Sequence, residues 1–126
     1  MTFISARIIT ANIDHLIDFY EQVTGFPANR YTEDFAEFRT PVAVLAIGST
    51  RTLQLFGGES IASPAANRSV ILEFRVDDVD AHYERLADYL GKALVQKPTT
   101  MPWGNRSLLF RDPDGNLINF FTPGGN

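Results

Sequence analysis

The amino-acid sequence repeats its own pattern once along the chain. When the two halves of the sequence are aligned so that Asp14 matches Asp80, Gly25 also matches Gly91. In each copy a short strand-like run is followed by a polar cap and by an amphipathic helix that ends in glycine. A chain built from two copies of one supersecondary unit must bury two similar apolar faces, and this constrains the fold more than any other feature of the sequence.

Each copy predicts one strand, one helix and three further strand segments. The first strands are expected at residues 4–11 and 69–76, and the later segments at residues 27–38, 43–47 and 52–56 in the first copy and 93–97, 107–110 and 117–121 in the second. We therefore predict a single α+β domain of two tandem βαβββ modules that form a curved mixed sheet with the helices on its outer face. Module one spans residues 1–56, a linker spans 57–68, and module two spans 69–126.

Composition excludes several function classes. Eleven Lys and Arg against fifteen Asp and Glu give a net charge of −4, which argues against a nucleic-acid partner. The sequence shows neither an apolar stretch of about 20 residues nor a signal peptide, so we expect no membrane partner and a cytoplasmic location. The absence of cysteine excludes thiolate nucleophiles and Cys-based metal sites.

Alternation along four of the predicted strands separates two faces, because successive strand side chains point in opposite directions. One face is almost wholly apolar and is expected to lie under the helices. The other mixes charged, amide and aromatic groups, which suits a small-molecule cavity or, equally, a partly covered dimer surface. This second face comprises Ser5, Arg7, Ile9, Thr52, Gln54, Phe56, Ile71, Glu73, Arg75, Leu117, Asn119 and Phe121.

Three segments carry a resemblance to a known family. They are residues 12–25 (NIDHLIDFYEQVTG), 72–86 (LEFRVDDVDAHYERL) and 102–123 (PWGNRSLLFRDPDGNLINFFTP). Together with the paired βαβββ plan, they resemble the vicinal oxygen chelate superfamily, which contains glyoxalases, extradiol dioxygenases, and bleomycin and fosfomycin resistance proteins. The resemblance covers nearly the whole chain and implies a fold without fixing one activity.

The resemblance also implies where a metal would bind. Enzymes of this superfamily hold a divalent metal through His or Gln, Glu, His and Glu on four strands, and the corresponding positions here are Ser5, Gln54, Ile71 and Asn119. None is a histidine or a carboxylate, so we expect no metal and no cofactor. His15 and His82 fall on the predicted helices.

Glu73 is the one weak catalytic candidate. It is either a displaced metal ligand, a general base, or a carboxylate paired with Arg75 or Arg7. Trp103 precedes the penultimate strand, where the resemblance places a residue over the cavity mouth. The charge of a ligand stays open, since Arg7 favours a carboxylate or phosphate whereas the net charge favours a cation.

We expect a small-molecule-binding protein, closest in character to the metal-free bleomycin-resistance members, that sequesters an aromatic or heteroaromatic compound. By resemblance we also expect a homodimer and a role in antibiotic resistance. The alternatives are a glyoxalase-, dioxygenase- or isomerase-type enzyme that uses a displaced metal or Glu73 as a base, or an interaction module without a ligand. The candidate ligand-binding residues are Ser5, Arg7, Phe38, Gln54, Phe56, Ile71, Glu73, Trp103, Arg106, Asn119 and Phe121.

Overall fold

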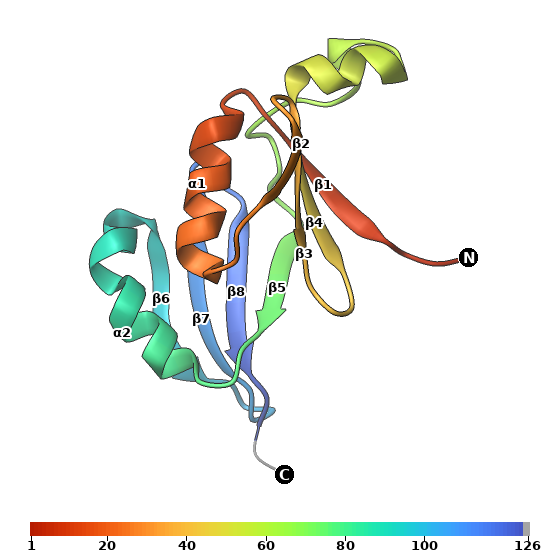
Figure 1. Ribbon diagram of the computed structural model, residues 1–126. Coiled ribbons are helices and arrows are strands. Elements are labelled where there is room, and N and C mark those ends of the chain that lie inside the picture. Colours follow the sequence, from red (N-terminus) through yellow and green to blue (C-terminus); the bar gives the residue numbers. More distant parts are fainter. Residues whose placement is uncertain (125–126) are drawn as a thin grey trace. The chain divides into compact units, whose positions relative to one another are not determined.

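The computed structural model describes residues 1–124, and the chain divides into two compact units with the boundary between Ala66 and Asn67. Each unit contains one strand, one α-helix and three further strands in that order, which confirms an α+β fold of two tandem βαβββ modules (Figure 1). Hydrogen bonding groups the strands into two four-stranded mixed sheets, one in each unit. No helix in the described part of the chain has the length and apolarity needed to cross a membrane.

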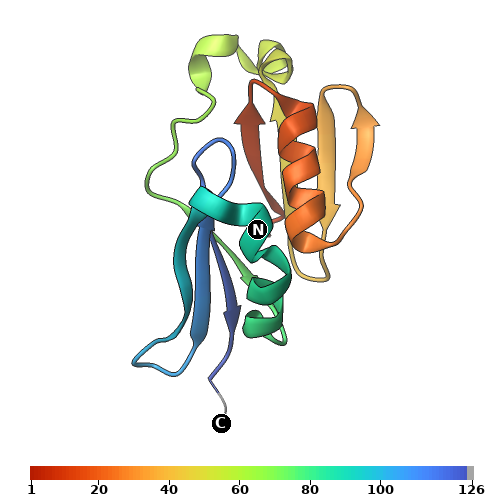
Figure 2. The ribbon, with the colours of Figure 1, turned by 90° about the vertical axis from the view of Figure 1, so that its left-hand side faces the viewer.

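The first unit is a four-stranded sheet covered on one face by a helix (Figure 2). The sheet order is β1-β4-β3-β2, with β1 and β4 parallel and the other neighbours antiparallel. Two short 3-10 helices, η1 and η2, follow the last strand. The elements are β1 (Ser5–Thr10), α1 (Ile13–Thr24), β2 (Asn29–Thr32), β3 (Phe35–Arg39), β4 (Val44–Ser49), η1 (Thr50–Phe56) and η2 (Glu59–Ile61).

Helix α1 begins and ends where its sequence predicts. The Asn12 side chain accepts a hydrogen bond from the backbone N–H of His15 (3.2 Å), which satisfies one of the free amides of the first turn. Gly25 ends the helix in the left-handed region at φ 75°. The apolar stripe of the helix, including Leu16, Tyr20 and Val23, is buried against the sheet.

The prediction of a strand at residues 52–56 is wrong, because this segment belongs to η1. Strand β4 already pairs with β1 along its whole length, from Ser5 opposite Val44 to Thr10 opposite Ser49. The Ser49 side chain then accepts a hydrogen bond from the backbone N–H of Arg51 (3.2 Å) and starts the 3-10 helix. Leu53 is 3% exposed and Leu55 is 89% exposed, so the two leucines do not share a buried face.

The second unit repeats the topology of the first. Its sheet order is β5-β8-β7-β6, with β5 and β8 parallel, and α2 packs on β6, β7 and β8. Asp78 caps α2 by accepting a hydrogen bond from the backbone N–H of Ala81 (3.1 Å). The core includes the edge-to-face pair Phe110 and Phe120, with ring centroids 5.0 Å apart. The elements are β5 (Ile71–Arg75), α2 (Val79–Leu90), η3 (Gly91–Ala93), β6 (Leu94–Thr100), β7 (Arg106–Arg111) and β8 (Leu117–Thr122).

Candidate functional site

The sheet of the first unit has one face that α1 leaves uncovered, here called the first open face. Strand register and alternation assign its residues, because β1, β4 and β3 present every second side chain to it. The face mixes small, aromatic and charged groups. It comprises Ser5, Arg7, Ile9, Val44, Ala46, Gly48, Phe35, Glu37 and Arg39, and Phe56 of η1 joins it through Arg7.

Arg7 is the central cation of the first open face. Its guanidinium carbon lies 4.8 Å from the ring centroid of Phe35 and 5.5 Å from that of Phe56. Both distances are within the range of a cation–π interaction, which holds an arginine in place without a carboxylate partner. Arg7 and Phe56 were predicted on this face. Phe35 was not, because the alternation was applied to only four strands and β3 was left out.

Gly48 makes room for this arrangement. A Cβ atom at this position would lie 3.0 Å from Thr52 Oγ1 and 3.5 Å from Arg7 Cδ and Ile9 Cδ1. Only the first of these distances is shorter than an ordinary contact, so the bare backbone allows the start of η1 to lie close to β4. Thr52 is held there by the hydrogen bond that its hydroxyl donates to the Ser49 carbonyl (2.7 Å). A glycine within a strand is the sequence signal for such a close approach.

A second arginine lies on the same face but is already bound. Arg39 forms an ion pair with Glu37 at 2.9 Å. Its Nε donates a long hydrogen bond to the Tyr31 hydroxyl (3.5 Å), and this contact and Glu37 raise the pKa of Arg39 above its usual value. The Tyr31 ring lies 6.0 Å from that of Phe35, so the aromatic cluster extends to β2. Sequence reasoning missed Tyr31, Glu37 and Arg39 for the same reason that it missed Phe35.

Two predicted ligand-binding residues of the first unit lie elsewhere. Phe38 is 1% exposed and its ring is 6.0 Å from that of Tyr20 in α1, so it belongs to the core under the helix. Its neighbours Glu37 and Arg39 are the residues of β3 that face the other way. Gln54 is exposed on η1 and is not on a strand at all. The prediction that Phe38 lines the open face is therefore wrong, and so is the strand position of Gln54, whereas a role of Gln54 in ligand binding stays a prediction.

The sheet of the second unit presents a corresponding open face, here called the second open face. Ile71, Glu73, Asn119 and Phe121 all lie on it, since Ile71 pairs with Leu117, Glu73 with Asn119 and Arg75 with Phe121. The Asn119 amide donates a hydrogen bond to the Glu73 carboxylate, with Nδ2 and Oε2 2.9 Å apart. This neighbour was not expected, because the sequence suggested Arg75 or Arg7 as the partner of Glu73. The side-chain oxygen of Asn119 is buried and accepts no hydrogen bond.

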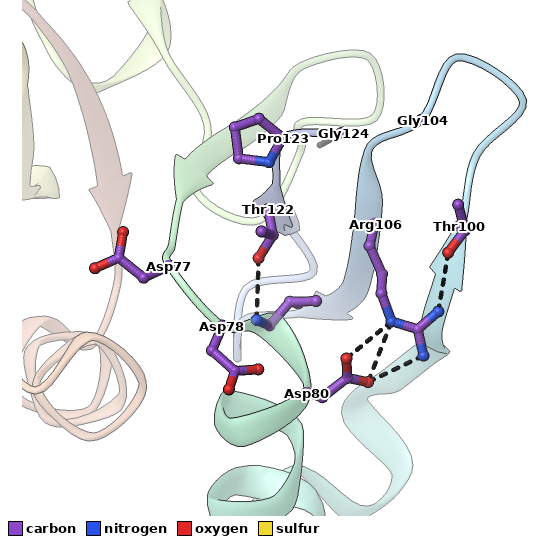
Figure 3. Close-up of a pocket in the computed structure, with 10 residues that line it drawn as sticks. Asp77, Asp78, Asp80, Thr100, Gly104, Arg106, Thr122, Pro123 and Gly124 are labelled. Carbon is purple, nitrogen blue, oxygen red and sulfur yellow. Dashed lines mark hydrogen bonds and ion pairs between the residues drawn. The ribbon is translucent and has the colours of Figure 1, made fainter. Parts of the chain in front are cut away.

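Arg106 lies on the opposite face of the second sheet. It pairs with Thr122 across the strands and forms an ion pair with Asp80 in the first turn of α2, with Nε 2.9 Å from Oδ2. The pair lines a pocket of about 260 Å³ at the start of α2, where Arg106 also donates to Thr100 Oγ1 (Figure 3). The guanidinium holds the pKa of Asp80 below its usual range. Arg106 therefore secures α2 from the helix-covered face of the sheet, and its role in ligand binding stays a prediction.

Trp103 lies in the hairpin loop between β6 and β7 and is 72% exposed. The loop is closed by hydrogen bonds from the backbone N–H of Met101 to the Asn105 carbonyl (2.7 Å) and from that of Gly104 to the Met101 carbonyl (2.9 Å). An exposed indole is open to contact with a ligand. Its place over a cavity mouth stays a prediction.

The strand register revises one of the four positions at which the superfamily binds metal. In the second unit, Asn119 lies on β8 two residues beyond the partner of Ile71. The same step in the first unit, from the partner of Ser5 on β4, leads to Ala46 and not to Gln54. Serine, alanine, isoleucine and asparagine offer no imidazole or carboxylate, so these positions do not fit the usual metal centre.

The remaining metal-binding side chains are dispersed. Within residues 1–124, no group of three or more His, Cys, Asp or Glu side chains is placed to hold a metal ion. His15 lies in α1 and His82 in α2, as predicted. The His82 ring packs edge-to-face on Phe120 with centroids 5.5 Å apart, and its Nδ1 lies 2.7 Å from a guanidinium nitrogen of Arg85. Partial burial and Arg85 lower the pKa of His82.

Comparisons with known proteins agree with this fold. The family model of the Glyoxalase/Bleomycin resistance protein/Dioxygenase superfamily matches residues 2–120. The chain is 26% identical over 125 residues to the uncharacterized protein YraH of Bacillus subtilis (strain 168), covering 96% of this chain and 98% of that protein. A solved protein of unknown function from Agrobacterium tumefaciens str. C58 has a TM-score of 0.81 at 26% identity, covering 97% of this chain and 94% of that one.

A second solved structure, a glyoxalase/bleomycin resistance protein/dioxygenase from Nocardioides, has a TM-score of 0.79 and covers 100% of this chain and 85% of that one. Its sequence identity of 22% makes it a likeness of fold alone. The match of the family model over nearly the whole chain carries the assignment. The chain belongs to the glyoxalase/bleomycin resistance protein/dioxygenase superfamily.

Proposed function

We propose that this protein binds a small aromatic or heteroaromatic molecule without the help of a metal ion, and that it sequesters the molecule rather than transforming it. The observation that carries the proposal is the aromatic cluster on the first open face. Phe35 and Phe56 both contact Arg7, and Tyr31 contacts Phe35. Tyr31 and Phe56 are exposed and Phe35 is half-buried, and aromatic rings that reach the surface can stack on flat ligands and bury a large area.

The composition of the first open face supports a role in ligand binding rather than a role as a surface that contacts only solvent. Leu53 anchors η1 in the core, whereas Phe56 at the end of the same 3-10 helix stays exposed. An exposed phenylalanine that is held in place by a buried neighbour offers apolar surface with little loss of conformational entropy on binding. A few polar groups beside such rings fix the orientation of a ligand, as in most small-molecule sites.

The four strand positions support the metal-free part of the proposal. Ser5 and Ala46 in the first unit and Ile71 and Asn119 in the second provide one hydroxyl and one amide among four side chains. Tight binding of zinc or iron needs imidazole, thiolate or carboxylate ligands. We therefore propose that ligand binding by this protein does not involve the metal centre that enzymes of the superfamily hold at these positions.

The test combines metal removal with a panel of neutral aromatic probes. Protein purified with EDTA and checked by elemental analysis is titrated with benzamide, indole and quinoline while amide shifts are followed by 1H–15N NMR. We expect shifts at Phe35, Gly48 and Phe56 that saturate and do not change when Zn²⁺, Fe²⁺, Ni²⁺ or Mn²⁺ is added. No saturable shift with any probe, or binding that appears only with stoichiometric metal, would overturn the proposal.

Proton transfer by Glu73 is the second candidate function, and the contact with Asn119 favours it. An amide donor at 2.9 Å orients the carboxylate, and a general base must be held in position to accept a proton from a substrate. The test is whether carbon-bound hydrogen atoms of probe molecules are exchanged for deuterium when the protein is incubated with them in D2O. Exchange that wild-type protein accelerates and Glu73→Gln abolishes would establish a catalyst in place of a pure binding protein.

The family resemblance leads us to propose, in addition, that two chains pair as a homodimer in the cytoplasm and that the bound compound is an antibiotic. Several large apolar side chains are exposed, among them Phe3, Val42 and Leu55, and an interface would cover such groups. Sedimentation equilibrium tests the dimer. A monomer at all concentrations would rule it out without affecting the binding proposal.

A further inference from the structure

Arg7 is held differently from the arginines that form ion pairs. Four arginines are paired with carboxylates: Arg30 with Asp14, Arg39 with Glu37, Arg51 with Asp34 and Arg106 with Asp80. Arg7 contacts two aromatic rings instead, and no carboxylate of the described side chains lies within ion-pair distance of it. Its charge is therefore positioned but not neutralised.

The two rings leave the hydrogen-bonding capacity of Arg7 free. A guanidinium has five N–H donors in a fixed planar fork, and contact with the face of a phenyl ring uses none of them as a strong hydrogen bond. The rings of Phe35 and Phe56 also displace water from part of the group. A partly dehydrated fork with unused donors binds a carboxylate or a phosphate in bidentate fashion.

The charges around Arg7 favour an anion, although the whole chain is acidic. The first open face carries two arginines, Arg7 and Arg39, against one acid, Glu37. Glu37 forms an ion pair with Arg39 at 2.9 Å, so the positive charge of Arg7 on this face is not balanced by an acid. The net charge of −4 is thus a property of the rest of the surface and does not set the charge at this position.

Phe35 and η1 hold Arg7 before any ligand arrives. The Phe35 ring centroid lies 4.8 Å from the guanidinium carbon, and η1 brings the Phe56 ring to 5.5 Å from it. The position of η1 is itself secured by the ion pair of Arg51 with Asp34 and by the burial of Leu53. A preorganised arginine loses little side-chain entropy on binding, which increases affinity.

We propose that Arg7 is the receptor for an anionic group on the aromatic ligand, so that the ligand class is an aromatic carboxylate or aryl phosphate. This inference rests on the proposed function, since the rings of Phe35 and Phe56 would stack on the aromatic part while Arg7 takes the acid. It resolves the conflict between Arg7 and the net charge that the sequence leaves open.

The experiment compares probes that differ only in charge. Benzoate, phenyl phosphate and the neutral isostere benzamide are titrated into wild-type protein and into Arg7→Gln, with 1H–15N NMR giving both the affinity and the residues affected. Arg68→Gln is the matched control, because it removes the same charge from an exposed residue outside both open faces. Inorganic phosphate serves as the anion without a ring, and the spectrum of each variant verifies that it is folded.

We expect wild-type protein and Arg68→Gln to bind benzoate or phenyl phosphate about tenfold or more tightly than benzamide, which is the contribution of a charge-assisted hydrogen bond. Arg7→Gln should bind all three within about twofold of each other. The comparison of benzoate with phenyl phosphate identifies which acid the fork prefers. Arg7→Lys keeps the charge without the fork, so it should retain only part of the preference.

Three results would overturn the inference, and they separate it from the proposed function. If wild-type protein binds benzamide as tightly as benzoate, the aromatic site exists but Arg7 does not discriminate between anionic and neutral ligands. If Arg7→Gln keeps the preference for the anion, another cation provides it. If neither benzamide nor any anionic probe produces saturable shifts, the proposed function fails and this inference fails with it.

Discussion

Replacing Gly48 by alanine tests whether the first open face is built as described. The added Cβ would lie 3.0 Å from Thr52 Oγ1, which is closer than most real contacts, so Thr52 must move by a few tenths of an ångström. Thr52 is not free to do so, because its hydroxyl donates a hydrogen bond of 2.7 Å to the Ser49 carbonyl. Any shift of Thr52 is transmitted along η1 to Phe56.

The expected cost of Gly48→Ala follows from two opposing effects. Overpacking of this kind costs about 1–3 kcal/mol. Alanine in a strand restores about 0.5–1 kcal/mol relative to glycine, because the unfolded chain loses conformational freedom. The free energy of unfolding should therefore fall by roughly 0–2.5 kcal/mol.

A double-mutant cycle in urea isolates the contact itself. Thr52→Ala removes the crowded oxygen, so the variant with both substitutions should be more stable than the sum of the single effects predicts, by about 0.5 kcal/mol or more. Additive free energies would refute the close approach of Thr52 to Gly48. The same variants can be titrated with benzoate, where Gly48→Ala should weaken binding because the shift of Thr52 along η1 would displace Phe56 from Arg7.

Three further predictions concern the core and the pH dependence of stability. Leu53→Ala should cost about 2–5 kcal/mol and Leu55→Ala less than about 0.5 kcal/mol in urea unfolding, because only the first is buried; equal costs would argue for a strand here. Phe38→Ala should cost about 3–5 kcal/mol, as for a core phenylalanine, and a neutral result would return Phe38 to the ligand site. The folded-state pKa of His82 is lowered below the usual 6.5, so the folded state binds fewer protons than the unfolded state and stability falls as the pH drops through and below about 6.5. Urea unfolding at pH 7.5 and 5.5 should show this loss in wild-type protein and a smaller one in His82→Gln; the same loss in both would exclude His82 as its source.

Local patterns in the sequence determine most of the architecture. The caps at Asn12 and Asp78, the glycines that end both helices and the internal repeat all depend on contacts within a few residues, and the structure confirms them. The repeat also predicts that both units have one topology, because the same order of apolar and polar residues must bury the same face. Alternation assigned the open faces of β1, β5 and β8 for the same reason.

The identity of the strand beside β1 depends on distant residues and was not predicted. Two segments of the first unit, 43–47 and 52–56, have compositions that suit a strand, and alternation does not say which one pairs with β1. The structure gives the place to β4, and the pairing of Asp34 with Arg51 and the cap at Ser49 turn the second segment into a 3-10 helix. Gln54 is therefore in η1 and not in the sheet, and Ala46 occupies the strand position at which enzymes of the superfamily carry a metal ligand.

What the sequence by itself determined is the family, the repeated topology and the absence of imidazole and carboxylate ligands at three of the four strand positions, Ser5, Ile71 and Asn119. These follow from residue types at fixed spacings. Only the tertiary structure decided which side chains meet on the first open face, since Arg7, Phe35 and Gly48 come from three different strands and Phe56 comes from a 3-10 helix. The physical reason is that a cation–π contact and a missing Cβ act through space, and neither leaves a periodic signal along the chain.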